Sequence, residues 1–442
     1  MDKKAILDNV QNLTAEQLFK EINYENVTLT ELVDTEQLDS FKRKLIISLL
    51  KKQESEDDLV WERARNGNEL SLHDYISCGY KRHKEEALMK IKDFEDHRQK
   101  AIHEKNKILN QLKRNYNSYT PGIINKYLKD GIISEPDLLD CNIPQSIIDK
   151  LNNIVQPRLH LGDTPASIPD GFTEVYFWGI PGSGKTCALA ATLSTAEKLG
   201  YLDIATGPGY DYMTRLKNIF ARDSAVLPPP SPVETTQYLP FILKKGNDKA
   251  RSVSLIELSG EIFQCFYRKN ANLPMLTQHH ENTFESLIRF LKGSNRKIHF
   301  FFIDFEKEND PDADGYKQGD YLSAASTFFR NNDIFGKATD AIYVVITKSD
   351  LMPDKNTYDE RVAHSKQYLS SNNFSAFINS LKDRCNQHSI NAGKLTVEPF
   401  SLGKVFFQQI CDFDKSSAEN IINILIDRIP PNKKSILDFF NK

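Results

Sequence analysis

The amino-acid sequence predicts an α/β domain with a mixed, mostly parallel sheet covered by helices on both faces, preceded by an all-helical region. From about residue 172 onward, β-branched and aromatic runs alternate with amphipathic segments, as they do in α/β domains. Residues 1–152 instead carry Lys, Glu, Leu and Ile at helical spacing, with almost no strand-like alternation. A glycine-rich loop at residues 179–186 stands between a strand-like and a helix-like segment.

Composition limits the classes of function that the chain can have. Its 442 residues include 57 basic and 60 acidic side chains, and no half reads as a basic arm, so a nucleic-acid partner is not expected. The six cysteines are scattered without C-x-x-C spacing, which indicates neither a zinc site nor a disulfide framework. The N-terminus lacks the apolar core of a signal peptide, and no apolar run could span a bilayer. We therefore expect a cytoplasmic protein without a transmembrane segment.

The first 152 residues are expected to form a helical adaptor or sensor region. Residues 22–34 align with residues 128–140, and each copy has a good N-cap residue, Thr28 or Ser134, three positions before an acid. The pattern predicts two copies of a short helix, a tight turn and a second, capped helix, although chance similarity of two helix starts explains it equally well. Residues 84–114 predict one long helix, and residues 153–171, which contain several prolines and glycines, predict a linker to a domain at 172–442.

The loop Gly179-Ile-Pro-Gly-Ser-Gly-Lys-Thr186 matches the phosphate-binding pattern G-x-x-x-x-G-K-[ST], with a strand before it and a helix after it. Its glycines let backbone N–H groups converge on phosphate oxygens, and the helix N-terminus adds a partial positive charge. Lys185 is expected to reach the β- and γ-phosphates, and the Thr186 hydroxyl to bind Mg²⁺. The residues expected to hold the nucleotide here are Gly179, Pro181, Gly182, Ser183, Gly184, Lys185, Thr186 and Cys187.

The segment AIYVVITKSD, residues 341–350, indicates which base the nucleotide carries. A buried strand is followed by Thr347-Lys348-Ser349-Asp350, at the strand end where ligands bind in open α/β sheets. Together with the phosphate loop, this resembles the N/T-K-x-D motif of P-loop GTPases of the Ras-like and translation-factor group. The resemblance implies a three-layer P-loop fold in which Asp350 accepts hydrogen bonds from guanine, Lys348 lies along the base, and Thr347 ties the two loops together.

The same resemblance implies a Mg²⁺-binding threonine before the second strand of the family and a D-x-x-G motif after the third. Thr235 and Thr236 stand directly before a strand-like segment, and either could bind the metal. Glu257 and Gly260 occupy the D-x-x-G positions, with Glu in place of the usual Asp. Glu261 stands where relatives orient the attacking water, so hydrolysis is expected to be slow. The strands ending near Leu243 and Glu257 should form an antiparallel hairpin at the sheet edge, where Pro240 is tolerated.

Three further features accompany this interpretation. Asp304 follows another buried strand, and in an alternative ATPase or kinase reading it would be the Mg²⁺-supporting acid. Ser401 and Leu402 loosely match the loop that contacts the guanine O6 atom in the GTPase group. Residues 207–232 are expected to form an elaborated first switch, and His279-His280 a surface pair.

The sequence thus predicts a GTP/GDP- and Mg²⁺-binding regulatory switch, resembling uncharacterised bacterial GTPases, whose helical region acts on an unknown protein effector. A P-loop ATPase or kinase and a scaffold that binds nucleotide without hydrolysis remain the alternatives.

Overall fold

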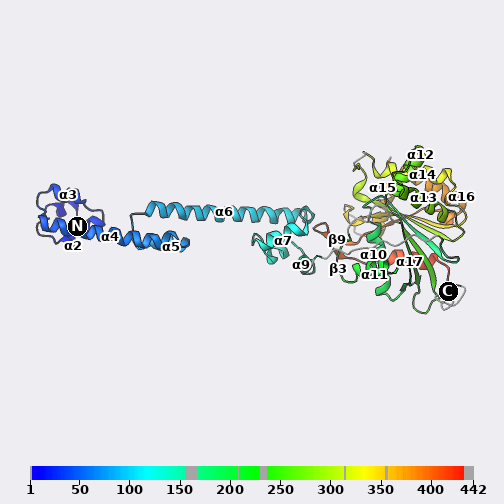
Figure 1. Cartoon of the computed structure of the whole chain (residues 1–442), viewed down its shortest axis with the longest axis horizontal. Helices are drawn as coiled ribbons and strands as arrows, with labels where there is room; N and C mark the ends of the chain where they lie inside the picture. Colours follow the sequence, from blue (N-terminus) through cyan, green and yellow to red (C-terminus); the bar gives the residue numbers. More distant parts are fainter. Residues whose placement is uncertain are drawn as a thin grey trace. The chain divides into compact units, whose positions relative to one another are not determined.

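A computed structural model describes residues 2–152, 154, 167–204, 206–207, 209–228, 236–312, 315–353, 357–371 and 373–432 (Figure 1). The chain divides into two compact units, Met1–Ile108 and Leu109–Lys442. Residues 109–152 therefore belong with the sheet, whereas the sequence placed the boundary at 153–171. The reason is packing: helix α9 (Gln145–Leu151) contacts strands of the second unit. Residues 155–166 of the expected linker lie outside the described residues.

The first unit is helical, as expected. Its helices are α1 (Lys3–Leu7), α2 (Ala15–Asn23), α3 (Leu29–Asp34), α4 (Ser40–Arg65), α5 (Glu69–Ser77) and most of α6 (Lys84–Arg114). Helix α6 has the bounds that its apolar spacing predicts. No helix within the described ranges combines the length and the apolar character needed to cross a bilayer.

The internal repeat is confirmed at the level of local structure. The second copy comprises α7 (Pro121–Lys129) and α8 (Glu135–Leu139), as α2 and α3 form the first. The backbone N–H of Thr28 donates to Glu31 at 3.0 Å, and that of Ser134 donates to Asp137 at 2.8 Å. Each carboxylate thus satisfies an N–H at a helix start that would otherwise lack an intrahelical partner.

The second unit is built on a seven-stranded sheet in the order β2-β4-β5-β1-β6-β7-β8. β1 lies between β5 and β6, and the β5-β1-β6-β7-β8 neighbours are all parallel, whereas β4 is antiparallel to both β5 and β2. The predicted mixed, mostly parallel sheet is confirmed. The strands are β1 (Thr173–Trp178), β2 (Leu202–Ile204), β4 (Gln237–Leu243), β5 (Arg251–Glu257), β6 (Lys297–Asp304), β7 (Thr339–Thr347) and β8 (Thr396–Pro399).

Helices cover both faces of this sheet, which gives the predicted three-layer sandwich (Figure 1). One face packs against α10 (Lys185–Lys198), α11 (Tyr210–Ile219) and α17 (Ser416–Arg428). The other packs against α12 (Ile262–Asn270), α13 (Gln278–Leu291), α14 (Gln318–Asn331), α15 (Tyr358–Leu369) and α16 (Ser375–His388). Short 3₁₀ turns are η1 (Tyr116–Ser118), η2 (Phe305–Lys307), η3 (Ser349–Leu351) and η4 (Ile390–Gly393).

The β4-β5 hairpin is present, but β4 is not the outermost strand. The three-residue strand β2 pairs with Phe241, Ile242 and Leu243. Pro240, which has no N–H to donate, lies one residue beyond the last of these pairs and pairs with Ser254 of β5. The expectation that this strand lies at the sheet edge was therefore wrong. A second sheet, ordered β3-β10-β9, comprises Ser224–Val226, Ile410–Phe413 and Gly403–Phe406.

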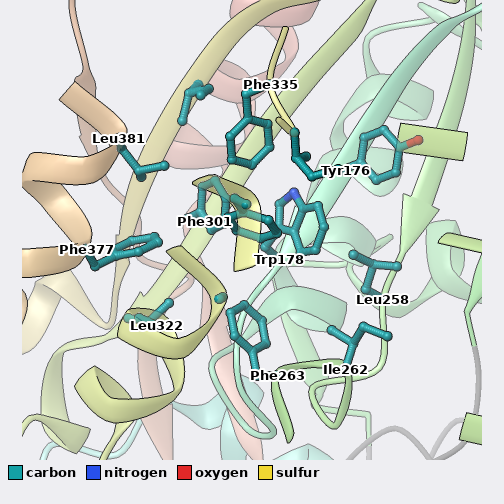
Figure 2. Close-up of a cluster of buried hydrophobic side chains, with 14 of the residues drawn as sticks. Tyr176, Trp178, Leu258, Ile262, Phe263, Phe301, Leu322, Phe335, Phe377 and Leu381 are labelled. Carbon is teal, nitrogen blue, oxygen red and sulfur yellow. The ribbon is translucent and has the colours of Figure 1, made fainter. Parts of the chain in front are cut away.

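The uninterrupted apolar run Phe300–Ile303 is explained by the central position of β6 in the sheet. All eight residues of β6 are buried, because helices cover both faces of a parallel sheet. Figure 2 shows the aromatic packing on one face, where Tyr176 and Trp178 of β1 and Phe301 of β6 lie close to one another. The rings of Trp178 and Phe301 are stacked at 5.6 Å.

A buried histidine in this core makes folding stability depend on pH. His299 of β6 is fully buried and accepts a hydrogen bond from the Trp178 indole at 3.0 Å, and burial lowers its pKa far below the usual value, with a further contribution from Lys297. The folded state keeps the ring neutral while the unfolded chain takes up a proton near pH 6.5, so stability is constant above that pH and falls below it.

We expect the free energy of unfolding to fall between pH 7.5 and 5.5 by about 1.4 kcal/mol more in the parent protein than in His299→Gln. Urea titrations of both proteins at the two pH values measure this difference. Equal losses of unfolding free energy in the two proteins would show that the pKa of His299 is the same in the folded and unfolded states.

Candidate functional site

The glycine-rich loop joins the carboxyl end of β1 to the start of α10, in the centre of the sheet. Gly184 caps α10 in a left-handed conformation with φ 86°. A Cβ atom added to it would lie 3.3 Å from Cγ2 of Thr347, so both the backbone angle and the tight contact favour glycine. The loop therefore presents the N-terminus of α10, with its partial positive charge, at the sheet edge where ligands bind.

The buried Lys185 side chain is hydrogen-bonded to the backbone of this loop. Its Nζ atom donates to the carbonyl oxygens of Gly179 at 2.6 Å and Ile180 at 2.9 Å. Burial lowers the pKa of Lys185 to about 8; the nearby Glu257 charge opposes this effect and that of Lys307 adds to it. Lys307, at the end of η2, donates to the Pro181 carbonyl oxygen at 3.3 Å. Two lysines thus lie at the phosphate loop, of which the sequence pattern identifies only the first.

Glu257 is the carboxylate that meets the Thr186 hydroxyl. It is buried at the end of β5 and accepts hydrogen bonds from Thr186 and, at 2.6 Å, from the Tyr212 phenol. Burial raises the pKa of Glu257, while these two hydrogen bonds and the Lys185 charge oppose the increase. Thr186 and Glu257 supply adjacent oxygen atoms, which are the donors that Mg²⁺ prefers.

Asp304, the alternative acid, has different partners. It is fully buried, its Oδ2 atom lies 3.0 Å from Nζ of Lys348, and its Oδ1 atom accepts from the Glu306 backbone N–H at 3.0 Å. It thus orders the turn after β6 and holds the Lys348 side chain. Among the described residues no three His, Cys, Asp or Glu side chains gather as they would around a metal held by protein alone.

Gly260 packs directly on the phosphate loop. A Cβ atom at this position would lie 2.2 Å from the backbone nitrogen of Pro181, so any larger residue would displace one of the two segments. Thr236 is buried immediately before β4, whose first residue, Gln237, pairs with Glu257. Thr235 lies outside the described residues.

The expectation that His279 and His280 form a surface pair is wrong for His280. This side chain is 11% exposed, and its Nε2 atom lies 2.9 Å from Oε2 of Glu261, which is itself 16% exposed. Its Nδ1 atom lies 2.8 Å from the hydroxyl of Thr277, which caps α13. The start of α13 thus brings the imidazole to Glu261 at the start of α12. Arg215 of α11, in the region expected to be an elaborated switch, pairs with Asp211 on the same helix.

The Thr347–Asp350 segment lies beside the phosphate loop. The Thr347 hydroxyl donates to the carbonyl oxygen of Ser183 at 3.0 Å and to that of Ile303 at 3.2 Å. Lys348 adopts a left-handed conformation with φ 56°, which is unfavourable for a residue with a side chain and is common at functional sites. Its Nζ atom also donates to Glu306 at 2.7 Å, and this contact with Asp304 and Glu306 fixes the lysine stem.

Ser401 holds the Asp350 carboxylate. Its hydroxyl donates to Oδ1 of Asp350 at 2.7 Å and accepts from the Gly403 N–H at 3.0 Å. The backbone N–H of Ser349 donates to the Phe400 carbonyl oxygen at 3.1 Å. The loosely matching Ser401-Leu402 loop therefore lies against the Thr347–Asp350 segment through both side-chain and backbone hydrogen bonds.

One cavity of about 690 Å³ joins these parts. This volume lies within the range of roughly 300–1,000 Å³ that is common for small-ligand sites. The phosphate loop lines it with Gly182, Gly184 and Cys187, whose thiol pKa burial raises to about 12. Thr347, Lys348, Asp350, Leu402 and Gly403 line it as well. The cavity wall also includes residues that sequence reasoning missed, namely 114–117, Leu227, Val405 and Gln408.

The sequence offers a signal for only some of the missed residues. Lys307 follows the buried strand β6 at its carboxyl end, where site residues gather in parallel sheets, so its position could have been anticipated. Residues 114–117 lie at the end of helix α6, which is remote in sequence from both motifs, and nothing in their composition marks them.

Comparisons with known proteins identify no family for this chain. No known protein family matches the sequence, and no curated protein does. Among solved structures, the chain is similar to a signal recognition particle receptor SRb-GTP/SRX complex from Chaetomium thermophilum, with 16% identity and a TM-score of 0.28. The similarity covers 58% of this chain and 99% of the other. A similarity of this size carries no information about function.

Proposed function

We propose that the chain is a GTP-binding regulatory switch that hydrolyses GTP slowly. The observation that supports this most is that one cavity is lined both by the phosphate loop and by Lys348 and Asp350. A bound nucleotide would place its phosphates at the loop and its base at Lys348 and Asp350. In the order β4-β5-β1-β6-β7-β8, with β4 antiparallel, the two motifs follow β1 and β7, which are parallel strands separated by β6, so both motifs lie at the same edge of the sheet.

Guanine is favoured over adenine by the chemistry of Asp350. Ser401 occupies part of Oδ1, but a carboxylate has about four acceptor positions, so Asp350 can still accept from the N1–H and 2-amino groups of guanine. Adenine has neither donor in that geometry and would leave the carboxylate without these bonds. Asp304, the acid of the ATPase alternative, is bonded to Lys348 and the η2 turn, and Glu257 is the acid bonded to Thr186.

Thr186 and Glu257 would hold Mg²⁺, with Thr235 or Thr236 added when the triphosphate is bound. The metal would supply positive charge against the β- and γ-phosphates. Gly260 lies against Pro181, so a change of the phosphate loop is transmitted directly to the start of α12. These contacts support a nucleotide-dependent change at Gly260, with the helical region 1–152 acting as adaptor or sensor for a protein partner.

Parallel binding titrations with fluorescent GTP and ATP, with Mg²⁺ present, test the base assignment. We expect GTP to bind at least 100-fold more tightly, because two charge-assisted hydrogen bonds distinguish the bases. Equal affinities for GTP and ATP would overturn the guanine assignment and would favour the ATPase alternative.

Hydrolysis depends on the Glu261 carboxylate, which His280 engages at 2.9 Å. A carboxylate near the γ-phosphate repels it, whereas a glutamine can orient water without charge. We expect Glu261→Gln to change the single-turnover hydrolysis rate by tenfold or more while GTP affinity stays within a few-fold of the parent. The assay must measure the product GDP directly. If neither protein forms GDP, the result favours the non-hydrolysing scaffold.

A further inference from the structure

The end of the long helix α6 contributes to the same cavity as the two nucleotide motifs. Helix α6 ends at Arg114, and the 3₁₀ turn η1 begins at Tyr116. Residues 114–117 line the cavity together with Asp350 and Lys348. These residues precede the phosphate loop by more than sixty positions and belong to neither motif, so the resemblance assigns them no role.

This segment is held in place by contacts on both sides of its turn. The Tyr116 ring packs on Phe406 of β9, with ring centres 4.6 Å apart. The backbone N–H of Gln408 donates to Oδ1 of Asn117 at 2.9 Å, and its side-chain amide donates to the Asn117 carbonyl oxygen at 2.8 Å. Phe406 and Gln408, which make these contacts, follow the Ser401–Gly403 loop in the chain. The loop that holds Asp350 therefore leads directly into β9, the strand on which Tyr116 packs.

Tyr116 lines the same cavity as Asp350, the carboxylate that would bind the base. Its side chain is half-buried, and burial raises the pKa of the phenol, with a further contribution from the Asp350 charge. The phenol therefore stays neutral at ordinary pH, and the ring offers a flat, uncharged surface in the cavity that it shares with Asp350. Among the aromatic residues lining this cavity, Phe400 is buried to 3% exposure, whereas Tyr116 retains exposed surface.

We propose that Tyr116 is a base-contacting residue, whose ring packs against the guanine bound by Asp350 and so makes the end of α6 a part of the nucleotide site. This inference rests on the proposed guanine-nucleotide binding and adds to it a residue from outside the GTPase-like motifs. Aromatic rings stack on bases because both have flat π faces, and the contact tolerates any base. Occupancy of the site therefore stabilises the position of residues 114–117 at the end of the helical region.

The test compares three variants of the full chain in GDP titrations with Mg²⁺. Tyr116→Ala should weaken GDP binding roughly 5- to 100-fold, the range found for removal of one aromatic–base stack. Tyr116→Phe keeps the ring and should stay within twofold of the parent. Tyr119→Ala is the matched control, because Tyr119 lies in the same segment, packs edge-on against Tyr127 and does not line the cavity.

The outcomes separate this inference from the proposed function. If the parent binds GDP and Tyr116→Ala binds it equally well, Tyr116 does not contact the base and only this inference fails. If the parent itself binds no guanine nucleotide, the proposed function fails. Weakening by Tyr119→Ala equal to that by Tyr116→Ala would show a general disturbance of the segment and would also overturn the inference. Hydrogen exchange of residues 113–119 in the parent should slow on GDP addition, and unchanged exchange contradicts the coupling to α6.

Discussion

Replacing Asp350 by asparagine is expected to lower the affinity for GDP roughly 100- to 10,000-fold and to raise the affinity for xanthosine diphosphate. Two hydrogen bonds to a charged acceptor contribute about 1.5–3 kcal/mol each, and the asparagine amide presents a donor toward the guanine N–H groups. Xanthine carries an oxygen in place of the 2-amino group, so the new amide can donate to it. Ser401, whose hydroxyl donates to Oδ1 of Asp350, holds the carbonyl oxygen of the new side chain in the same place.

Competition titrations with GDP and xanthosine diphosphate measure the change of preference. Asp359→Asn is the matched control, because this carboxylate is exposed in the first turn of α15, away from the cavity, and its loss should leave both affinities unchanged. Loss of GDP binding without a gain for xanthosine diphosphate would mean that Asp350 supports the loop and does not read the base.

Much of the sheet is predictable because each strand carries its own local signal. The apolar runs of β1, β5, β6 and β7 are buried on both faces, and such runs read as central parallel strands whatever surrounds them. The two loops follow from the same rule, since residues that follow parallel strands meet at one edge of the sheet. This is why Thr347 could be expected next to the phosphate loop, 164 positions away from Ser183.

The contacts that complete the site could not be predicted, because they join segments whose local patterns are ordinary. Tyr212 reaches Glu257 from α11, in the region that was expected to form an elaborated switch, and His280 reaches Glu261 from the start of α13. Gln408 meets Asn117 across 291 positions. Only the packing of helices on the sheet brings these residues together, and neither periodicity nor motif spacing contains that information.

The edge strand gives a smaller example of the same limit. Pro240 favours a strand at the sheet edge, because a proline has no N–H to donate to a neighbouring strand. It does not reveal that β2 pairs with the neighbouring residues Phe241–Leu243. A three-residue strand has too short a pattern to be distinguished from a loop.

Replacing Lys185 by methionine is expected to weaken GTP and GDP binding by roughly 100-fold or more. The methionine keeps the unbranched stem in its buried place but removes a charge that would meet the phosphates, where hydrogen bonds to charged groups contribute about 1.5–3 kcal/mol each. The pH dependence should change as well. The Lys185 amine has a pKa of about 8 in the free protein, and bound phosphates require its charged form, so binding above pH 8 takes up a proton.

In the parent protein, the affinity for GDP should therefore be constant below about pH 8 and should fall by up to tenfold between pH 8 and 9, whereas in Lys185→Met it should be low and flat over this interval. Lys198→Met, in the last turn of the same helix, removes an equal charge that pairs with Asp223 on the surface, and it should keep both the affinity and the slope of the parent. An affinity of Lys185→Met within a few-fold of the parent would contradict a phosphate-binding role, because a buried ammonium group at the phosphates cannot be lost without cost.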